Sequence, residues 1–140
     1  MLFTDTMTVY NHYMEDGQDK YKRTIVRGVQ WSHSRVMTTT SGNAMTEDRV
    51  ESITIDFDSN YGNEQYINPI EFKKEDDHIG HWTLNQKDGK DIALLGVGNE
   101  ITPDYTVKQL KADHQYIGTV ISVADNRNRQ FLKTIKVVVK

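Results

Sequence analysis

The chain of 140 residues is long enough for one domain with a substantial core, and its formal charge of −3 argues against a protein that mainly grips phosphate backbones. It contains no cysteine, which excludes disulfides, thiolate nucleophiles and cysteine-ligated zinc or iron–sulfur clusters. The N-terminal stretch holds no apolar run of the length that a signal sequence or membrane span needs, so we expect an intracellular protein without membrane contact.

The N-terminal segment shows the two-residue period of a β-strand. Met7 and Val9 fall on one face of residues 6–13, and polar residues alternate with them. An Asp-Gly turn signal follows, and the next stretch is rich in tyrosine and β-branched residues. The pattern predicts a β-hairpin over residues 6–31.

The next segment, which contains three consecutive threonines and a Ser-Gly pair, has neither a strand period nor a helix period. We interpret Thr38 to Asp48 as a long loop. Its few apolar side chains cannot offset the cost of ordering it, so we expect it to be mobile in the isolated chain and ordered on assembly. A merely tolerated surface insertion is the alternative, because long loops cost little in closure entropy.

Residues 50–57 alternate clearly and predict a strand. We expect a short edge strand around Pro69, because proline cannot donate to a ladder and is tolerated mainly at sheet edges. Trp82 and Leu84, an Asp-Gly turn and the apolar run 92–95 together predict a second hairpin.

The sequence indicates one short helix, in the segment "TVKQLKAD" that begins at Thr106. Thr106 could cap it, and Val107 and Leu110 would share its apolar face over one or two turns.

The C-terminal segment reads as a last hairpin, with an apolar strand from Ile117, the polar turn "ADNRNRQ" and a return from Phe131. The run of valines at 137–139 suggests a final strand covered on both faces. We therefore predict an all-β, mainly antiparallel fold: one small β-barrel domain over residues 1–140, with a long inserted loop and at most one short helix.

The best candidate for a metal site is "DDHIGHW", in which His78 and His81 could join Asp76 or Asp77. The two histidines flank a glycine in a charged stretch, and we interpret them as exposed loop residues. The "GVGNE" stretch lacks the third glycine and the helix of a dinucleotide-binding fingerprint. We predict no catalytic residue, no metal and no cofactor.

Single-stranded nucleic-acid binding on an OB-like barrel remains an alternative, because aromatic side chains on strands could stack bases beside basic residues. The aromatic residues are Tyr10, Tyr21, Trp31, Phe72 and Trp82, and the basic ones are Arg127, Arg129 and Lys133. The other interpretation is that these rings form core and cross-strand pairs.

Charge is distributed unevenly along the chain. From Glu47 to Asp77 there are ten acidic and three basic residues, whereas residues 126–140 contain five basic residues and no acidic one. Either both segments are solvated faces, or they are complementary surfaces that meet in a partner or in a neighbouring copy.

The chain resembles the small β-rich minor capsid and head–tail connector proteins of tailed phages and prophages of Gram-positive bacteria. The resemblance lies in four segments and the threonine-rich stretch between them: "TVYNHY", "RTIVRGVQWSHSR", "EDRVESITID" and "ISVADNRNRQFLKTIKVVVK". The resemblance implies a non-enzymatic virion protein, made in the bacterial cytoplasm, that forms a homo-oligomeric ring at the portal vertex, as stopper subunits do.

The same resemblance implies contacts with portal, adaptor or tail proteins and leaves contact with packaged DNA open. The interaction residues that it suggests are Thr38, Thr39, Thr40, Ser41, Gly42, Asn43, Arg127, Arg129 and Lys133. A projecting loop and complementary charges would suit head-to-tail contacts between copies, which close into a ring when the rotation permits.

Overall fold

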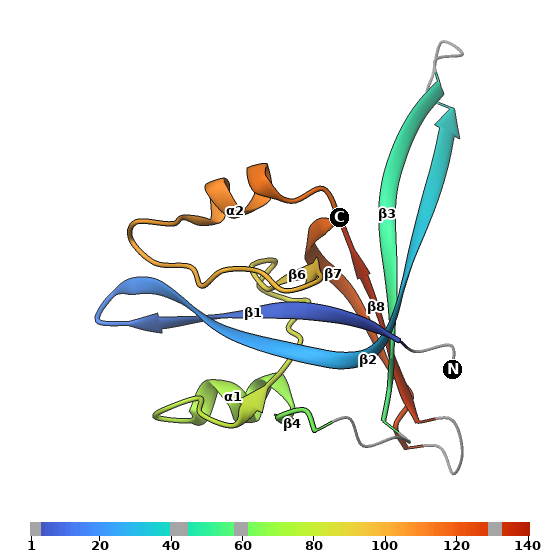
Figure 1. Ribbon diagram of the computed structural model, residues 1–140. Helices are drawn as coiled ribbons and strands as arrows, with labels where there is room; N and C mark the ends of the chain where they lie inside the picture. The colour runs from blue at the N-terminus through green and yellow to red at the C-terminus, as the bar shows by residue number, and fades with distance from the viewer. Residues whose placement is uncertain (1–3, 40–44, 58–61, 129–132) are drawn as a thin grey trace.

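The fold is built on an antiparallel sheet that closes on itself (Figure 1). The structure is a computed structural model, and it describes residues 4–39, 45–57, 62–128 and 133–140. Six strands form the ring in the order β1-β2-β3-β8-β7-β6. They are β1 (Asp5–Glu15), β2 (Gln18–Thr39), β3 (Met45–Asp56), β6 (Ile92–Leu95), β7 (Ile117–Asp125) and β8 (Thr134–Val139). The predicted class, mainly antiparallel β with a closed sheet, is confirmed.

Two short helices and a second, two-stranded sheet complete the structure. They are β4 (Gln65–Tyr66), α1 (Pro69–Lys74), β5 (His81–Trp82) and α2 (Val107–Asp113). The expectation of at most one helix is therefore wrong. No helix within the described ranges is long and apolar enough to cross a membrane.

The β1–β2 hairpin forms as predicted, and its turn lies at Asp16 and Gly17. Both residues have positive φ, 53° and 74°, which is the backbone geometry that a two-residue hairpin turn requires. Gly28 interrupts the ladder further along β2: the register shifts between Asp5 and Thr6 opposite it, and its own φ is 81°. This bulge marks the point where β2 leaves β1.

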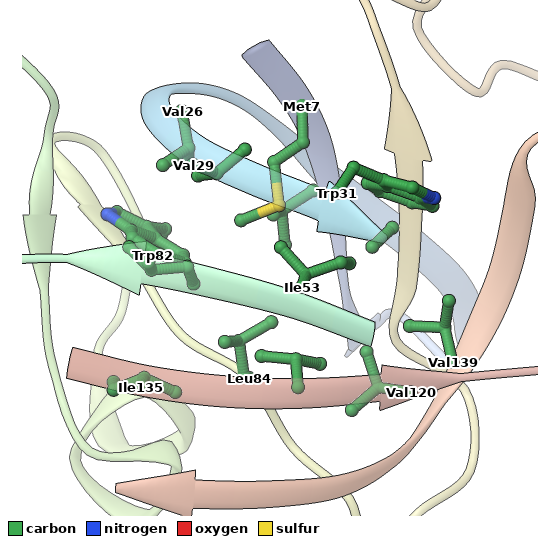
Figure 2. Close-up of a cluster of buried hydrophobic side chains, with 14 residues drawn as sticks. Met7, Val26, Val29, Trp31, Ile53, Trp82, Leu84, Val120, Ile135 and Val139 are labelled. Carbon is green, nitrogen blue, oxygen red and sulfur yellow. The ribbon is translucent and has the colours of Figure 1, made fainter. Parts of the chain in front are cut away.

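The core fills the ring with side chains from all six of its strands and from β5 (Figure 2). Trp82 on β5 is 1% exposed, and its indole nitrogen donates to the Glu64 carbonyl at 2.9 Å. The β4–α1–β5 segment thus contributes a large side chain to the core. A second cluster joins Leu110 of α2 to Tyr10 on β1 and to Ile92 and Leu94 on β6.

The segment around Pro69 is a helix and not the expected edge strand. Asn68 caps it by accepting the Ile70 backbone N–H at 2.8 Å, and Pro69 occupies the first helical position, where a missing N–H costs nothing. Phe72 is the side chain that α1 buries.

The expected hairpin over residues 81–95 does not form either. Strand β5 pairs in parallel with β4, whereas β6 pairs antiparallel with β1 and β7. The helix predicted after Thr106 is confirmed as α2, and a capping box between Thr106 and Gln109 starts it.

Strand β8 lies inside the sheet between β3 and β7, as predicted. Val137 and Val139 are buried, Val138 is half-buried and Lys136 is exposed. The expectation that both faces of the last strand are covered is wrong, because the side chains alternate between the core and the outside. Helix α2 packs over β1 and β6 instead of over β8.

Candidate functional site

The most prominent feature of the structure is a two-stranded arm, which we define as residues 34–39 of β2 and 45–50 of β3. Six register pairs hold it together, from Ser34 with Val50 to Thr39 with Met45. Pairing of β2 with β1 ends at Val29, and pairing of β3 with β8 begins only at Glu51. The two strands therefore leave the body together, and no strand of the described chain pairs with the outer edge of either (Figure 1).

A cluster of side chains fixes the root of the arm. The Glu51 carboxylate accepts the Trp31 indole N–H with one oxygen, and its other oxygen lies 3.1 Å from Nδ1 of His33. The His33 ring packs against Tyr116 with 4.4 Å between centroids. Asp5 accepts the Trp31 backbone N–H at 3.0 Å. These contacts connect β2, β3, the start of β1 and the residue before β7, so the root of the arm is held by the body.

The arm corrects the prediction of a long loop from Thr38 to Asp48. Thr38 pairs with Thr46 and Thr39 with Met45, so both threonines end β2, and residues 45–48 begin β3. Antiparallel pairing orders these residues although their sequence lacks a clear strand period. The remaining predicted interaction residues of this segment, Thr40, Ser41, Gly42 and Asn43, lie outside the described residues.

The basic residues predicted for interaction near the C-terminus have different surroundings. The Arg127 guanidinium bonds both oxygens of Asp125, at 2.9 and 3.2 Å from Nε and 2.9 Å from Nη2, and holds the pKa of that carboxyl below its usual value. The same guanidinium lies 4.6 Å from the centre of the Tyr66 ring. Arg127 is thus engaged within the chain. Lys133 is exposed, and Arg129 lies outside the described residues.

The interpretation of the "DDHIGHW" histidines as exposed loop residues is wrong: the His78 side chain is 10% exposed, His81 lies in β5, and both face one glutamate instead of Asp76 or Asp77. His81 Nδ1 lies 2.6 Å from Oε2 of Glu75, and His78 Nδ1 lies 3.8 Å from Oε1 of the same carboxylate. Across the described ranges, no three histidine, aspartate or glutamate side chains come together as a metal-ligand set.

The aromatic residues proposed for base stacking are mostly core residues. The four that are buried are Tyr10, Trp31, Phe72 and Trp82, and Tyr21 packs edge-on against His12. The interpretation of these rings as core and cross-strand pairs is the one that the structure bears out.

Two grooves flank α1. One, of about 340 Å³, lies between α1 and β7, and Ile70, Leu84 and Val123 contribute to its lining. The other, of about 400 Å³, lies between the end of α1 and the end of β1, and its walls carry Glu15, Glu75, Asp76 and Asp88. Lys73 borders both grooves, and its ammonium lies 2.7 Å from Asp88.

A buried polar network holds the 83–91 connection against β1. Asn11 donates to the Thr83 carbonyl at 2.6 Å and accepts the Thr83 N–H at 3.2 Å. Asp91 accepts from the Asn11 amide and from the backbone N–H groups of His12 and Asn85. Burial raises the pKa of Asp91, and the three donors oppose that rise.

Comparison with known proteins places the chain in one family. The model of a family of unknown function, DUF6751, matches residues 2–140. The chain belongs to DUF6751. No curated protein and no solved structure matches it.

Sequence reasoning missed the features that build this site. Gly28 within a strand-like stretch was a visible sign of a bulge. The roles of Trp31 and Glu51 had no local sign, because these residues meet only through the register of β2 against β3. The pairing of Glu75 with two histidines had no local sign either, because Asp76 and Asp77 stand as close to His78 in the sequence.

Proposed function

We propose that the protein is a structural subunit of a tailed phage or prophage virion, a head–tail connector of the stopper or minor capsid type that assembles as a ring at the portal vertex. It acts by binding and not by catalysis, and its neighbours are copies of itself and portal, adaptor or tail proteins. The resemblance in sequence described above supports this proposal together with one structural observation, the arm.

The arm supports an assembly role because an isolated two-stranded ribbon is only marginally stable in water. Each of its outer edges presents unpaired backbone groups, which are a template for pairing with another chain. The β1–β2 hairpin also extends beyond β6, and there Thr83 and Asp91 hold its base to the body through Asn11 and His12. The arm has no equivalent strand beside it in the described chain, so we expect a partner to cover it.

A closed body with one projecting ribbon suits a head-to-tail contact, in which the arm of one copy meets a different surface of the next. Such heterologous contacts close into rings when the rotation between neighbours permits. Each of the six strands pairs with a neighbour on both sides for part of its length, whereas the two strands of the arm pair only with each other.

The test compares the full chain with a variant in which an Asn-Gly turn replaces residues 36–48, so that Arg35 and Arg49 remain opposite each other. We expect the full chain to form rings at high concentration, seen by electron microscopy and mass photometry. The shortened variant should stay monomeric with a similar melting temperature. The matched control is Met14→Ser, a substitution at an exposed residue near the end of β1, and this variant should still assemble.

Monomers of the full chain at every concentration, or unchanged rings in the shortened variant, would contradict the proposal. Tight, salt-dependent binding of single-stranded oligonucleotides that weakens in Arg127→Ala would instead support nucleic-acid binding.

A further inference from the structure

The β1–β2 hairpin has one edge with which no strand of the described chain pairs. Strand β2 pairs with β1 from Gln18 to Val29, and its other side meets β3 only from Val29 onward. The first half of β2, before the bulge at Gly28, therefore has a strand neighbour on one side only.

One position on this edge shows which backbone groups point away from β1. The Arg27 N–H donates to Oδ1 of Asn63 at 2.9 Å, and the Arg27 carbonyl accepts from Nδ2 of Asn63 at 2.8 Å. The side-chain amide of Asn63 thus takes the place of a neighbouring strand. Because the backbone groups of successive residues alternate between the two sides of a strand, those of Arg23, Tyr21 and Asp19 point the same way. These residues have the geometry that an added strand needs.

The arm offers a matching edge on β3. The Phe57 N–H, just after this strand, donates to the Lys133 carbonyl on the side of β8 at 2.8 Å, so odd-numbered residues of β3 turn their backbone groups toward β8. Beyond the end of β8, the same alternation leaves the backbone groups of Arg49, Glu47 and Met45 facing outward. No strand within the described ranges pairs with them there.

The two edges differ in charge. Residues 18–27 of β2 contain four basic residues and one acidic one, whereas residues 45–50 of β3 contain two acidic residues and one basic one. Like charges directly opposite each other destabilise a strand pair, and opposite charges stabilise it. The basic edge therefore disfavours pairing with the same edge of a second copy and favours an acidic strand. Residues 34–39 of β2, on the other edge of the arm, contain no acidic residue.

We propose that the β3 edge of the arm adds as an antiparallel strand to the β2 edge of the hairpin in a second copy of the chain. This contact rests on the proposed ring and names the surface that receives the arm. In the register that we assign, Asp48 lies opposite Lys20 and Arg49 lies opposite Asp19, so two pairs of opposite charge form. The odd-numbered residues of both strands, whose backbone groups point outward, then also face each other.

The contact fits beside β8 and has the symmetry of a ring. The added strand ends opposite Arg49, and β8 takes the next hydrogen-bonding position of β3, where Val139 lies opposite Glu51. The arm of one copy and the hairpin of the next are different surfaces, so the contact is heterologous. Such a contact leaves a free arm and a free hairpin at the ends of a row of copies until the row closes.

Cysteine cross-linking tests the register, because the chain contains no cysteine of its own. Copies with Asp48→Cys are mixed with isotope-labelled copies with Lys20→Cys and oxidised mildly. We expect mixed disulfide dimers, identified by mass, to exceed the statistical proportion several-fold. The two positions form a non-hydrogen-bonded pair, in which the Cα atoms come close enough for a disulfide.

The control replaces Lys20→Cys with Lys108→Cys, at an exposed residue of α2, and should give no excess of mixed dimers. An excess of Asp48→Cys homodimers would show that arms pair with each other and would overturn the inference. A statistical mixture in both experiments would overturn it as well.

Charge reversal gives a second readout, the concentration at which rings form. Asp48→Lys and Lys20→Glu should each raise it several-fold, and the double variant should return it close to the wild-type value. A double variant no better than either single variant would overturn the inference and leave the connector proposal in place. Wild-type chains that stay monomeric at every concentration would overturn both. If a reversed variant does not fold, the cross-linking decides.

Discussion

Asn11 and Asp91 stand 80 positions apart in the chain, and Nδ2 of Asn11 donates to Oδ2 of Asp91 at 2.9 Å inside the protein. Both side chains are buried. The bond joins β1 to the start of β6 through side chains, next to the short stretch over which their backbones pair. It holds Asp91, at the end of the 83–91 connection, against β1, and the strand that follows pairs with β1 and β7 and not with β5.

Asp91→Asn should destabilise the fold by about 1–3 kcal/mol, because an amide nitrogen would then face a donor and leave a buried group unsatisfied. Denaturation in urea measures the loss. Asp104→Asn, at an exposed carboxylate before α2, is the control and should change little. Equal stability of the Asp91→Asn variant and the wild type would contradict the role assigned to the network.

The same variant has a pH signature. Burial raises the pKa of Asp91, so the folded chain holds this proton more tightly than the unfolded chain. The stability that it contributes is complete below the value of an unfolded aspartate, about 4, and declines as the pH rises towards the folded pKa. The advantage of the wild type over Asp91→Asn should therefore shrink as the pH rises through that interval.

Gly98→Ala should destabilise the protein by about 1–3 kcal/mol through overpacking. A methyl group at this position would overlap Cδ2 of Leu94 and the hydroxyl oxygen of Tyr10. In the double variant with Tyr10→Phe the loss should be less than the sum of the single losses, since one of the clashing atoms is gone. Strict additivity in a double-mutant cycle would show that the alanine is accommodated in another way.

The last strand offers a matched pair of substitutions. Val137→Ala should cost about 2–3 kcal/mol because the side chain is fully buried, whereas Val138→Ala, at a half-buried position, should cost clearly less. Removal of residues 137–140 should unfold the domain instead of trimming a tail. A truncated chain that melts like the full-length one would refute the structural role of β8.

Tyr10 should resist ionisation in alkali. Burial raises its pKa to about 12, although the Arg23 guanidinium opposes the rise. The folded chain therefore keeps a proton that the unfolded chain loses near pH 10, so stability from this group is present below pH ~10 and is lost as the pH rises towards 12. Ultraviolet absorbance should show a late-titrating tyrosine contribution that disappears in Tyr10→Phe. An unchanged titration curve in that variant would contradict this assignment.

The elements that the sequence predicted are those whose chemistry is local. The Asp16–Gly17 turn, the Thr106 cap and the alternating first strand each carry their signal within a few residues. The helix α1 carried one too, because Asn68 followed by Pro69 is a typical helix start, and the edge-strand interpretation overlooked it.

The features that were missed depend on contacts between distant segments. Pairing of β2 with β3 turned a threonine-rich stretch into strands, and β6 pairs with β1 and β7, which are distant in sequence, and not with β5. The spacing of His78 and His81 drew notice to their own stretch, but no single-sequence pattern shows which carboxylate they will face.

The bulge at Gly28 has a mechanical consequence. Beyond Val29, the next residue, β2 is paired with β3 alone, while β3 runs without a break from the arm into its ladder with β8. Because antiparallel hydrogen bonds lie perpendicular to their strands, a pull along the arm loads the bonds of this ladder together, in shear, and does not peel them apart one at a time. A neighbour that holds the arm would therefore transmit force directly into the strands that close the ring.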